Sequence, residues 1–235
     1  MNNKAYIELL FSFFRRDWLV RYGNGYFGYL ILLANPLAFL GLKLFIQSQV
    51  MQPLQLSAFL YGLMWWILLS STLANAAAVA SSYADLVRKA SFPRSILFVL
   101  PVLIALCDFL IGLLLYLLAT CYFEAIPFNF LSMLVSLLTV LPFLFGISAI
   151  LVTLIFRFRK MRFAIPFIIL AAFITTPFFF NQNTQHLGFI HYLNPFSLIV
   201  QNEQPTPVFA CIVGLCYLVI GILFFRHHAA RLADY

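Results

Sequence analysis

Residues 96–122 read ILFVLPVLIALCDFLIGLLLYLLATCY, and Asp108 is their one charged residue. The hydrocarbon core of a bilayer is about 30 Å thick, and a helix needs about 20 mostly apolar residues to cross it. A strand of a membrane barrel would alternate apolar and polar side chains, which this run does not do. The run therefore predicts a membrane-spanning helix, which satisfies its own backbone hydrogen-bonding groups inside lipid.

Composition extends this prediction to the whole chain. Of the 235 residues, 64% are hydrophobic and 9% are charged, which is too few charges for the polar shell of a soluble domain. We therefore expect an all-α integral membrane protein in which residues 1–235 form a single transmembrane domain. Six transmembrane helices are predicted from the apolar runs at 26–46, 56–81, 96–122, 128–156, 163–180 and 207–225.

Basic residues predict the orientation, because Lys and Arg are retained on the cytoplasmic side of a membrane. With six spans and both termini in the cytoplasm, all of the 14 Lys and Arg residues except Lys43 lie on that side. The connections at 47–55, 123–127 and 181–206 contain none. Lys43 is close to the outer end of the first span, where its long side chain either reaches the headgroups or faces a pore.

Other features of the composition argue against soluble functions. The net charge of +7 does not indicate nucleic-acid binding, because the cations lie between apolar runs and not on one solvated face. No metal site is expected, since His186 and His191 have no acid or cysteine near them, and no cleaved signal peptide is expected. The cysteines lack a CxxC spacing and are expected to be buried apolar residues: Cys107, Cys121, Cys211 and Cys216.

Residues 1–24 predict a helix that lies in the cytoplasmic interface. One helical face gathers the large apolar side chains, and the charged residues lie away from it. Arg15, Arg16 and Arg21 have two interpretations: they only anchor the helix, or they also meet a phosphorylated lipid substrate or the edge of a partner subunit. The apolar face consists of Ile7, Leu10, Phe11, Phe14 and Trp18.

Residues 84–94, ADLVRKASFPR, form a short cytoplasmic connection with apolar side chains among basic ones. Pro93 ends any helix before it. Ordinary loops rarely expose such residues as Leu86, Val87 and Phe92 to water, so they imply a docking partner. The segment is therefore either a helix that docks into a cytosolic partner or a loop that folds back onto the membrane.

The last external connection contains an apolar part, 187–200, of about 14 residues, which is too short to cross a bilayer. It predicts a segment that dips into the outer leaflet or lies on it. The segment is either a lid over an outward exit or a surface re-entrant segment without a gating role.

Polar residues inside the spans are expected to have partners. An ionised carboxylate such as Asp108 costs on the order of 2.5–3.5 kcal/mol at the centre of a span, and we favour a structural or pore-lining role for it over a proton relay. Asn75, Ser81 and Ser82 are expected to hydrogen-bond between helices. Aromatic residues with polar tips either anchor in the interface or stack on sugars in a passage: Tyr61, Trp65, Trp66 and Tyr116.

Taken in order, these segments resemble the permease subunits of ABC exporters for polysaccharides, the class that exports O-antigen, capsule and teichoic acid. The resemblance covers nearly the whole chain. At its start it rests on Arg16-Asp17, Arg21-Tyr22, Gly28 and Asn35-Pro36-Leu37. Further along it rests on Arg88-Lys89, Phe92-Pro93-Arg94, Pro177-Phe178-Phe179, Leu193-Asn194-Pro195 and Ala233-Asp234.

The resemblance implies a homodimer in the bacterial inner membrane, surrounded by membrane lipids, with two separate ATP-binding subunits on the cytoplasmic side. The substrate would be a lipid-linked polysaccharide, and this chain would be a transporter subunit and not an enzyme. It would hold no cofactor, since ATP and Mg would be bound by the partner subunits. In agreement, the sequence contains no G-x4-G-K-[ST] phosphate loop.

Roles for single residues follow from the matched segments. Coupling to the ATPase partner is implied for Asp85, Leu86, Val87, Arg88, Lys89, Phe92, Pro93 and Arg94. The diphosphate of a polyprenyl-linked glycan would be attracted by Arg15, Arg16, Arg21 and Tyr22. The gate would comprise Leu193, Asn194 and Pro195. Candidates for the channel lining are Tyr61, Trp65, Trp66, Asp108 and Tyr116.

Other function classes stay open. An ABC exporter of a drug or small lipid would use the same architecture. A polyprenyl-lipid membrane transferase would need paired carboxylates or an acid and a histidine at one membrane face, and here the acids are scattered singly. A proton-coupled transporter would want more intramembrane ionisable residues and an internal repeat, neither of which is evident.

Overall fold

The protein is helical throughout the part of the chain that the structure, a computed structural model, describes: residues 3–23, 26–50, 56–89, 93–123, 130–175, 196 and 207–229. Every regular element in these ranges is a helix, as predicted. In chain order they are α1 Asn3–Tyr22, α2 Tyr26–Val50, α3 Leu56–Ser82, α4 Ala84–Lys89, α5 Ile96–Phe123, α6 Phe130–Arg157, the 3-10 helix η1 Arg159–Ala164, α7 Ile165–Thr175 and α10 Pro207–Ala229.

Within the described residues, four helices are long and apolar enough to cross a membrane, which supports the prediction of a membrane protein. Two other helices have shorter described apolar stretches. In α2 this stretch is Pro36–Phe45, and α7 has 11 described residues. The count of six spans stays a prediction. The four helices contribute Phe59–Ser82, Ile96–Leu118, Phe130–Arg157 and Val208–His228.

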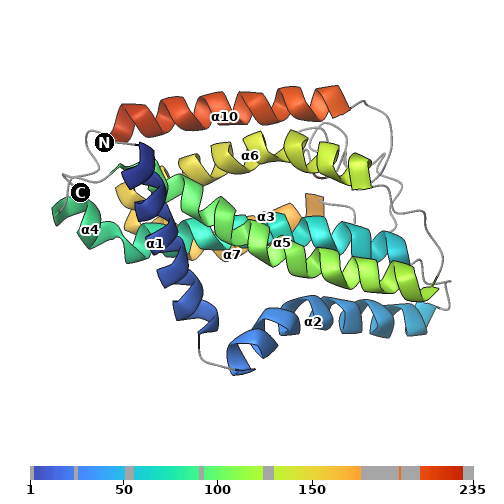
Figure 1. Cartoon of the computed structure of the whole chain (residues 1–235). Coiled ribbons are helices and arrows are strands. Elements are labelled where there is room, and N and C mark those ends of the chain that lie inside the picture. Colours follow the sequence, from blue (N-terminus) through green and yellow to red (C-terminus); the bar gives the residue numbers. More distant parts are fainter. Residues whose placement is uncertain are drawn as a thin grey trace.

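The bundle is built around α3, which packs against α5 and α6, while α10 packs along the other side of α6 (Figure 1). Burial separates a central from a peripheral helix. The apolar window of α3 is 72% buried and that of α10 only 22%. The outer side chains of α10, among them Val208, Ile212, Val219 and Leu223, are exposed. An apolar exposed face of this kind is stable only in an apolar environment, which agrees with a membrane-spanning helix.

Small residues let α6 and α10 approach closely. A Cβ atom on Gly146 would overlap the carbonyl oxygen of Tyr217, and a Cβ on Gly221 would overlap the carbonyl oxygen of Gly146. Gly214 is also close, because its Cβ would lie 3.1 Å from the carbonyl oxygen of Thr139. This is how helices associate in lipid, where backbone contact replaces the hydrophobic effect.

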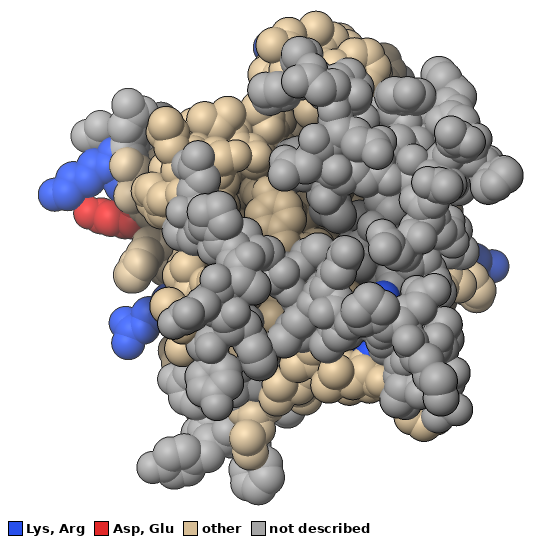
Figure 2. Space-filling view, turned by 90° about the vertical axis from the view of Figure 1, so that its right-hand side faces the viewer, with Lys and Arg blue, Asp and Glu red and all other residues tan. Residues whose placement is uncertain are grey.

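The two ends of the bundle differ. The start of α1, the helix α4 and the end of α10 lie together at one end, and α1 crosses the bundle steeply from there to reach α2 (Figure 1). Seen from the opposite end, the described surface is largely tan, and most of its blue and red atoms stand at the margins (Figure 2). The arrangement gathers α4 and the basic segment Arg159–Ala164 on the same end, next to the last turns of α3 and α6.

Candidate functional site where α1 meets the bundle

The predicted N-terminal helix exists, but its predicted apolar face is divided, because Leu10 and Phe14 of that face pack against the core while other members do not. Tyr6, Leu9 and Phe13 pack against the core, whereas Ile7 is 63% and Phe11 64% exposed. The core-facing side of the helix therefore includes residues outside the predicted face. The exposed apolar residues on its other side suit the interface position predicted for this helix.

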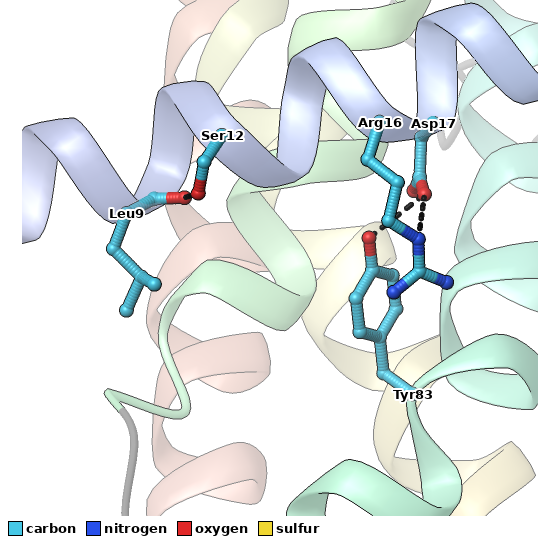
Figure 3. A network of polar contacts seen from close by, with 5 residues as sticks. All are labelled: Leu9, Ser12, Arg16, Asp17 and Tyr83. Atoms are coloured by element: carbon cyan, nitrogen blue, oxygen red, sulfur yellow. Dashed lines mark hydrogen bonds and ion pairs between the residues drawn. The ribbon is translucent and has the colours of Figure 1, made fainter.

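A polar network fixes α1 to the end of α3 (Figure 3). The Tyr83 hydroxyl donates a hydrogen bond to Oδ1 of Asp17 at 2.7 Å. The Nε atom of Arg16 lies 3.9 Å from the same oxygen, and its guanidinium carbon lies 4.8 Å from the centre of the Tyr83 ring. Burial, together with this hydrogen bond to a carboxylate, raises the pKa of Tyr83. Tyr83 therefore stays a neutral donor at physiological pH.

Apolar and hydroxyl contacts extend this junction. The Phe13 ring meets the Tyr83 ring edge-on with 5.0 Å between centroids. Nearer the N-terminus, the hydroxyls of Tyr6 and Ser95 lie 3.1 Å apart, which ties α1 to the turn before α5. The helix α1 thus contacts both sides of the segment that contains α4.

The predicted coupling segment is helical over Ala84–Lys89. It continues directly from Tyr83, whose carbonyl oxygen accepts a hydrogen bond from the Val87 N–H at 3.0 Å. The expectation that its apolar residues are exposed to water is wrong for Val87, which is only 4% exposed, and Leu86 is half-buried against the core. These two side chains hold the short helix against the bundle. Pro93 and Arg94 follow it and are half-buried.

The remaining coupling residues lie outside the described part of the chain. This applies to residues 90–92, which include Phe92, and to the side chains of Asp85, Arg88 and Lys89. Docking to an ATPase partner stays a prediction for all of them.

Asp108, the acid of the third predicted span, is held by donors from two other helices. The Tyr22 hydroxyl, at the end of α1, donates to its Oδ1 at 3.0 Å, and the Ser71 hydroxyl of α3 donates to its Oδ2. The Asn75 amide in turn donates to the Ser71 oxygen at 3.1 Å. In this series of hydrogen bonds the hydroxyl and amide donors are directed toward the carboxylate. Such an arrangement stabilises a negative charge away from water. Asp108 is therefore paired with donors, as expected.

A cavity of about 390 Å³ opens beside this chain of hydrogen bonds. Its lining combines apolar side chains with a carboxylate, hydroxyls, an amide and the Arg21 side chain. The Asn75 Oδ1 atom is buried without a hydrogen-bond partner among the described residues. Such groups hydrogen-bond ligands rich in hydroxyls. The lining residues are Arg21, Tyr22, Pro36, Phe39, Trp66, Ile67, Ser70, Ser71, Ala74, Asn75, Asp108, Ile111 and Ile169.

The aromatic residues proposed for a channel divide into two groups. Trp65 and Tyr116 are buried inside the chain, with Tyr61 between them at centroid distances of 6.1 and 5.7 Å. Trp66 lines the cavity together with Asp108. A channel-lining role stays a prediction for all of these residues.

The residues predicted to attract a lipid diphosphate do not form one cluster. Arg15 is exposed on the outer side of α1, Arg16 faces Asp17, and Arg21 and Tyr22 face the cavity. The predicted gate residues Leu193, Asn194 and Pro195 lie outside the described residues. Phe196 is described and is buried against Trp65 and Phe143.

Sequence reasoning missed Ser70 and Ser71 as site residues. A signal was present, because Ser71 and Asn75 are four residues apart and therefore share a helical face. What the sequence lacked was the register between α3 and α5 that brings this face to Asp108.

Comparison of the sequence with protein-family models gave no match, and comparison with curated proteins gave none either. The likeness to polysaccharide exporters therefore rests on the sequence segments alone.

Proposed function

We propose that this chain is the membrane subunit of an ATP-driven exporter that moves a lipid-linked polysaccharide across the bacterial inner membrane. In this proposal the chain crosses the membrane six times with both termini in the cytoplasm. It forms a homodimer and takes its energy from two ATP-binding subunits. The polymer would be of the O-antigen, capsule or teichoic-acid kind.

One observation carries the proposal: the helix α4 is continuous with the end of α3, which a polar network joins to α1. Its first residue follows Tyr83, whose hydroxyl binds Asp17 of α1. Val87 is buried against the bundle. A force applied to α4 would therefore move the end of α3 and the interface helix together, which is what coupling to a nucleotide-driven partner requires.

The cavity beside Asp108 supports the choice of substrate class. In the proposal, Arg21 attracts the lipid diphosphate, and the hydroxyls and amide of α3 meet the first sugar. Trp66 also lines this cavity and is of the residue type that stacks on sugars. A drug exporter would have no need for this concentration of hydrogen-bonding groups.

Deleting the gene in the bacterium that carries it tests the function. Surface polysaccharide is stained with a lectin in intact and in permeabilised cells. We expect the deletion strain to lose surface staining and to keep staining inside permeabilised cells, and the wild-type gene to restore export. Unchanged surface staining in the deletion strain would contradict the proposal.

A charge-reversed pair, Arg88→Glu with Lys89→Glu, tests the coupling assignment in the same strain. We expect this variant to reach the membrane at normal levels and to leave the glycan inside the cell. The matched control, Lys4→Glu with Arg226→Glu, changes the net charge equally at residues outside the segment and should restore export. Restoration by both variants would contradict the role of α4.

A further inference from the structure

A second cavity, also about 390 Å³, lies at the end of the bundle that carries α4. One side is formed by the last turns of α3 and the start of α4, with the small residues Ala80, Ser81 and Ala84. The other side is formed by the end of α6 and by η1. We call this the basic cavity; its remaining lining residues are Ile155, Phe156, Arg159, Lys160, Arg162 and Phe163.

Among the described residues, the charged side chains that line the basic cavity are all basic: Arg159, Lys160 and Arg162. Across the described part of the chain, Arg159 and Lys160 make no hydrogen bond or ion pair, and the Arg162 guanidinium lies 4.7 Å from the centre of the Phe163 ring. Three exposed cations around one hollow repel one another, so an anion bound there would lower their energy.

Arg157 is close to these basic residues in the sequence, but its side chain does not line the basic cavity. Its guanidinium lies 2.7 Å from Nε2 of His228 on α10 and 5.3 Å from the centre of the Phe158 ring. Arg157 therefore faces α10, while the next three basic residues surround the basic cavity.

The position of the basic cavity relative to the candidate spans indicates which kind of anion would bind there. Two candidate spans, Phe59–Ser82 and Phe130–Arg157, end at its walls, so it lies where the hydrocarbon core gives way to headgroups. The lining also contains apolar side chains, the buried Ile155 and Phe156 and the exposed Phe163. A lipid phosphate matches both kinds of residue, since its oxygens suit the Arg forks and its first carbons suit the apolar side chains.

We propose that the basic cavity binds the phosphate group of an anionic membrane lipid through Arg159, Lys160 and Arg162. The site is separate from the arginines of α1 and from the cavity beside Asp108. It requires that the chain be embedded in a membrane, and it does not depend on the exporter function. A lipid bound there would bridge the ends of α3 and α6 next to α4.

Binding is tested with the full-length protein in nanodiscs of phosphatidylcholine, titrated with fluorescent phosphatidylglycerol. Arg159→Gln with Lys160→Gln removes two contacts, and we expect the affinity to fall about tenfold or more. Ser81→Trp fills the hollow without changing any charge and should weaken binding similarly. The control, Lys4→Gln with Arg226→Gln, removes the same charge at exposed sites outside the cavity and should bind as wild type does.

Competitors then distinguish the sources of the phosphate. Displacement by unlabelled phosphatidylglycerol alone assigns the basic cavity to a glycerophospholipid, and stronger displacement by a polyprenyl diphosphate assigns it to a lipid carrier; each supports a lipid-phosphate site. Equal loss of affinity in the control variant would overturn the proposal, because the attraction would then be diffuse. Wild-type binding by Ser81→Trp would overturn it as well.

Discussion

The Tyr83 hydroxyl and the Asp17 carboxylate, 66 positions apart in the sequence, are joined by a hydrogen bond of 2.7 Å. Tyr83 is almost fully buried, and Asp17 is also near Arg16. The contact fastens the interface helix α1 to the point where α3 passes into α4. Within the described part of the chain, it is one of two hydrogen bonds from a tyrosine hydroxyl to a carboxylate that attach α1 to the bundle, the other joining Tyr22 to Asp108.

Replacing Tyr83 by Phe removes the hydroxyl and keeps the ring that packs against Phe13. We expect α1 to detach locally about ten times more often, in line with the loss of one charge-assisted hydrogen bond. Tryptic cleavage after Arg15 and Arg16 in membrane vesicles measures this opening. Tyr6→Phe removes a neutral hydroxyl contact of the same helix and should accelerate cleavage less. Equal cleavage rates in both variants and in wild type would show that apolar packing alone holds α1.

Asp108 is expected to stabilise the protein through its two hydroxyl donors, in spite of its position in an apolar span. Asp108→Leu would leave the Tyr22 and Ser71 hydroxyls without their acceptor, so we expect a loss of about 1–3 kcal/mol. Asp108→Asn keeps an acceptor oxygen and should lose less. Thermal unfolding in one detergent compares the three proteins. A leucine variant more stable than wild type would mean that desolvation of the acid outweighs its hydrogen bonds.

Tyr22 gives the protein a pH dependence in the alkaline range. Burial, followed by the charge of Asp108, raises the pKa of Tyr22 from 10.0 to about 12. The folded protein holds this proton more tightly than the unfolded chain, so the stabilisation is complete below pH 10.0 and is lost as the pH rises toward that raised value. Tyrosinate absorbance of wild type minus Tyr22→Phe isolates this one residue among 11 tyrosines. A difference titration centred at the ordinary pKa would contradict the buried contact with Asp108.

The sequence is sufficient to predict where the helices lie, but not which face of a helix packs against the rest of the protein. Long apolar runs determine helices in lipid because no other backbone arrangement satisfies its hydrogen bonds there, and the bounds of α3 and α5 were predicted within a few residues. The start of α7 was placed two residues early. A 3-10 helix precedes it, and α7 begins at Ile165 with Pro166 in its first turn, where a missing N–H costs little.

Side-chain partners depend on information that a single sequence does not contain. On α1, apolar residues occur on two sides, and only the position of Tyr83 decides that Phe13 points inward. Val87 resembled an exposed docking residue because its neighbours are basic, yet it is buried. The sequence alone does not identify Ser71 as a site residue. Its hydroxyl reaches Asp108 because of the register in which α3 packs against α5.

The glycines between α6 and α10 are expected to be intolerant of even one methyl group. Gly221→Ala would force the helices apart at the Gly146 carbonyl, with a loss of about 1–3 kcal/mol. Gly41→Ala is the matched control, since a Cβ there meets nothing within 4 Å, and it should be neutral or stabilising by up to about 1 kcal/mol. Thermal unfolding of both variants in detergent gives the comparison. A stable Gly221→Ala protein would show that α10 is held by other contacts.

Orientation is tested by single thiols at the two ends of the proposed bundle, after the native cysteines have been replaced by alanine. The basic residues around Ser91 should keep it in the cytoplasm, while the connection that contains Thr184 has no Lys or Arg. In intact cells, a membrane-impermeant maleimide should therefore label Thr184→Cys and leave Ser91→Cys unlabelled until the cells are permeabilised. The opposite pattern would place α4 outside the cell, away from ATP, and the exporter proposal would fail even though the helices themselves were correct.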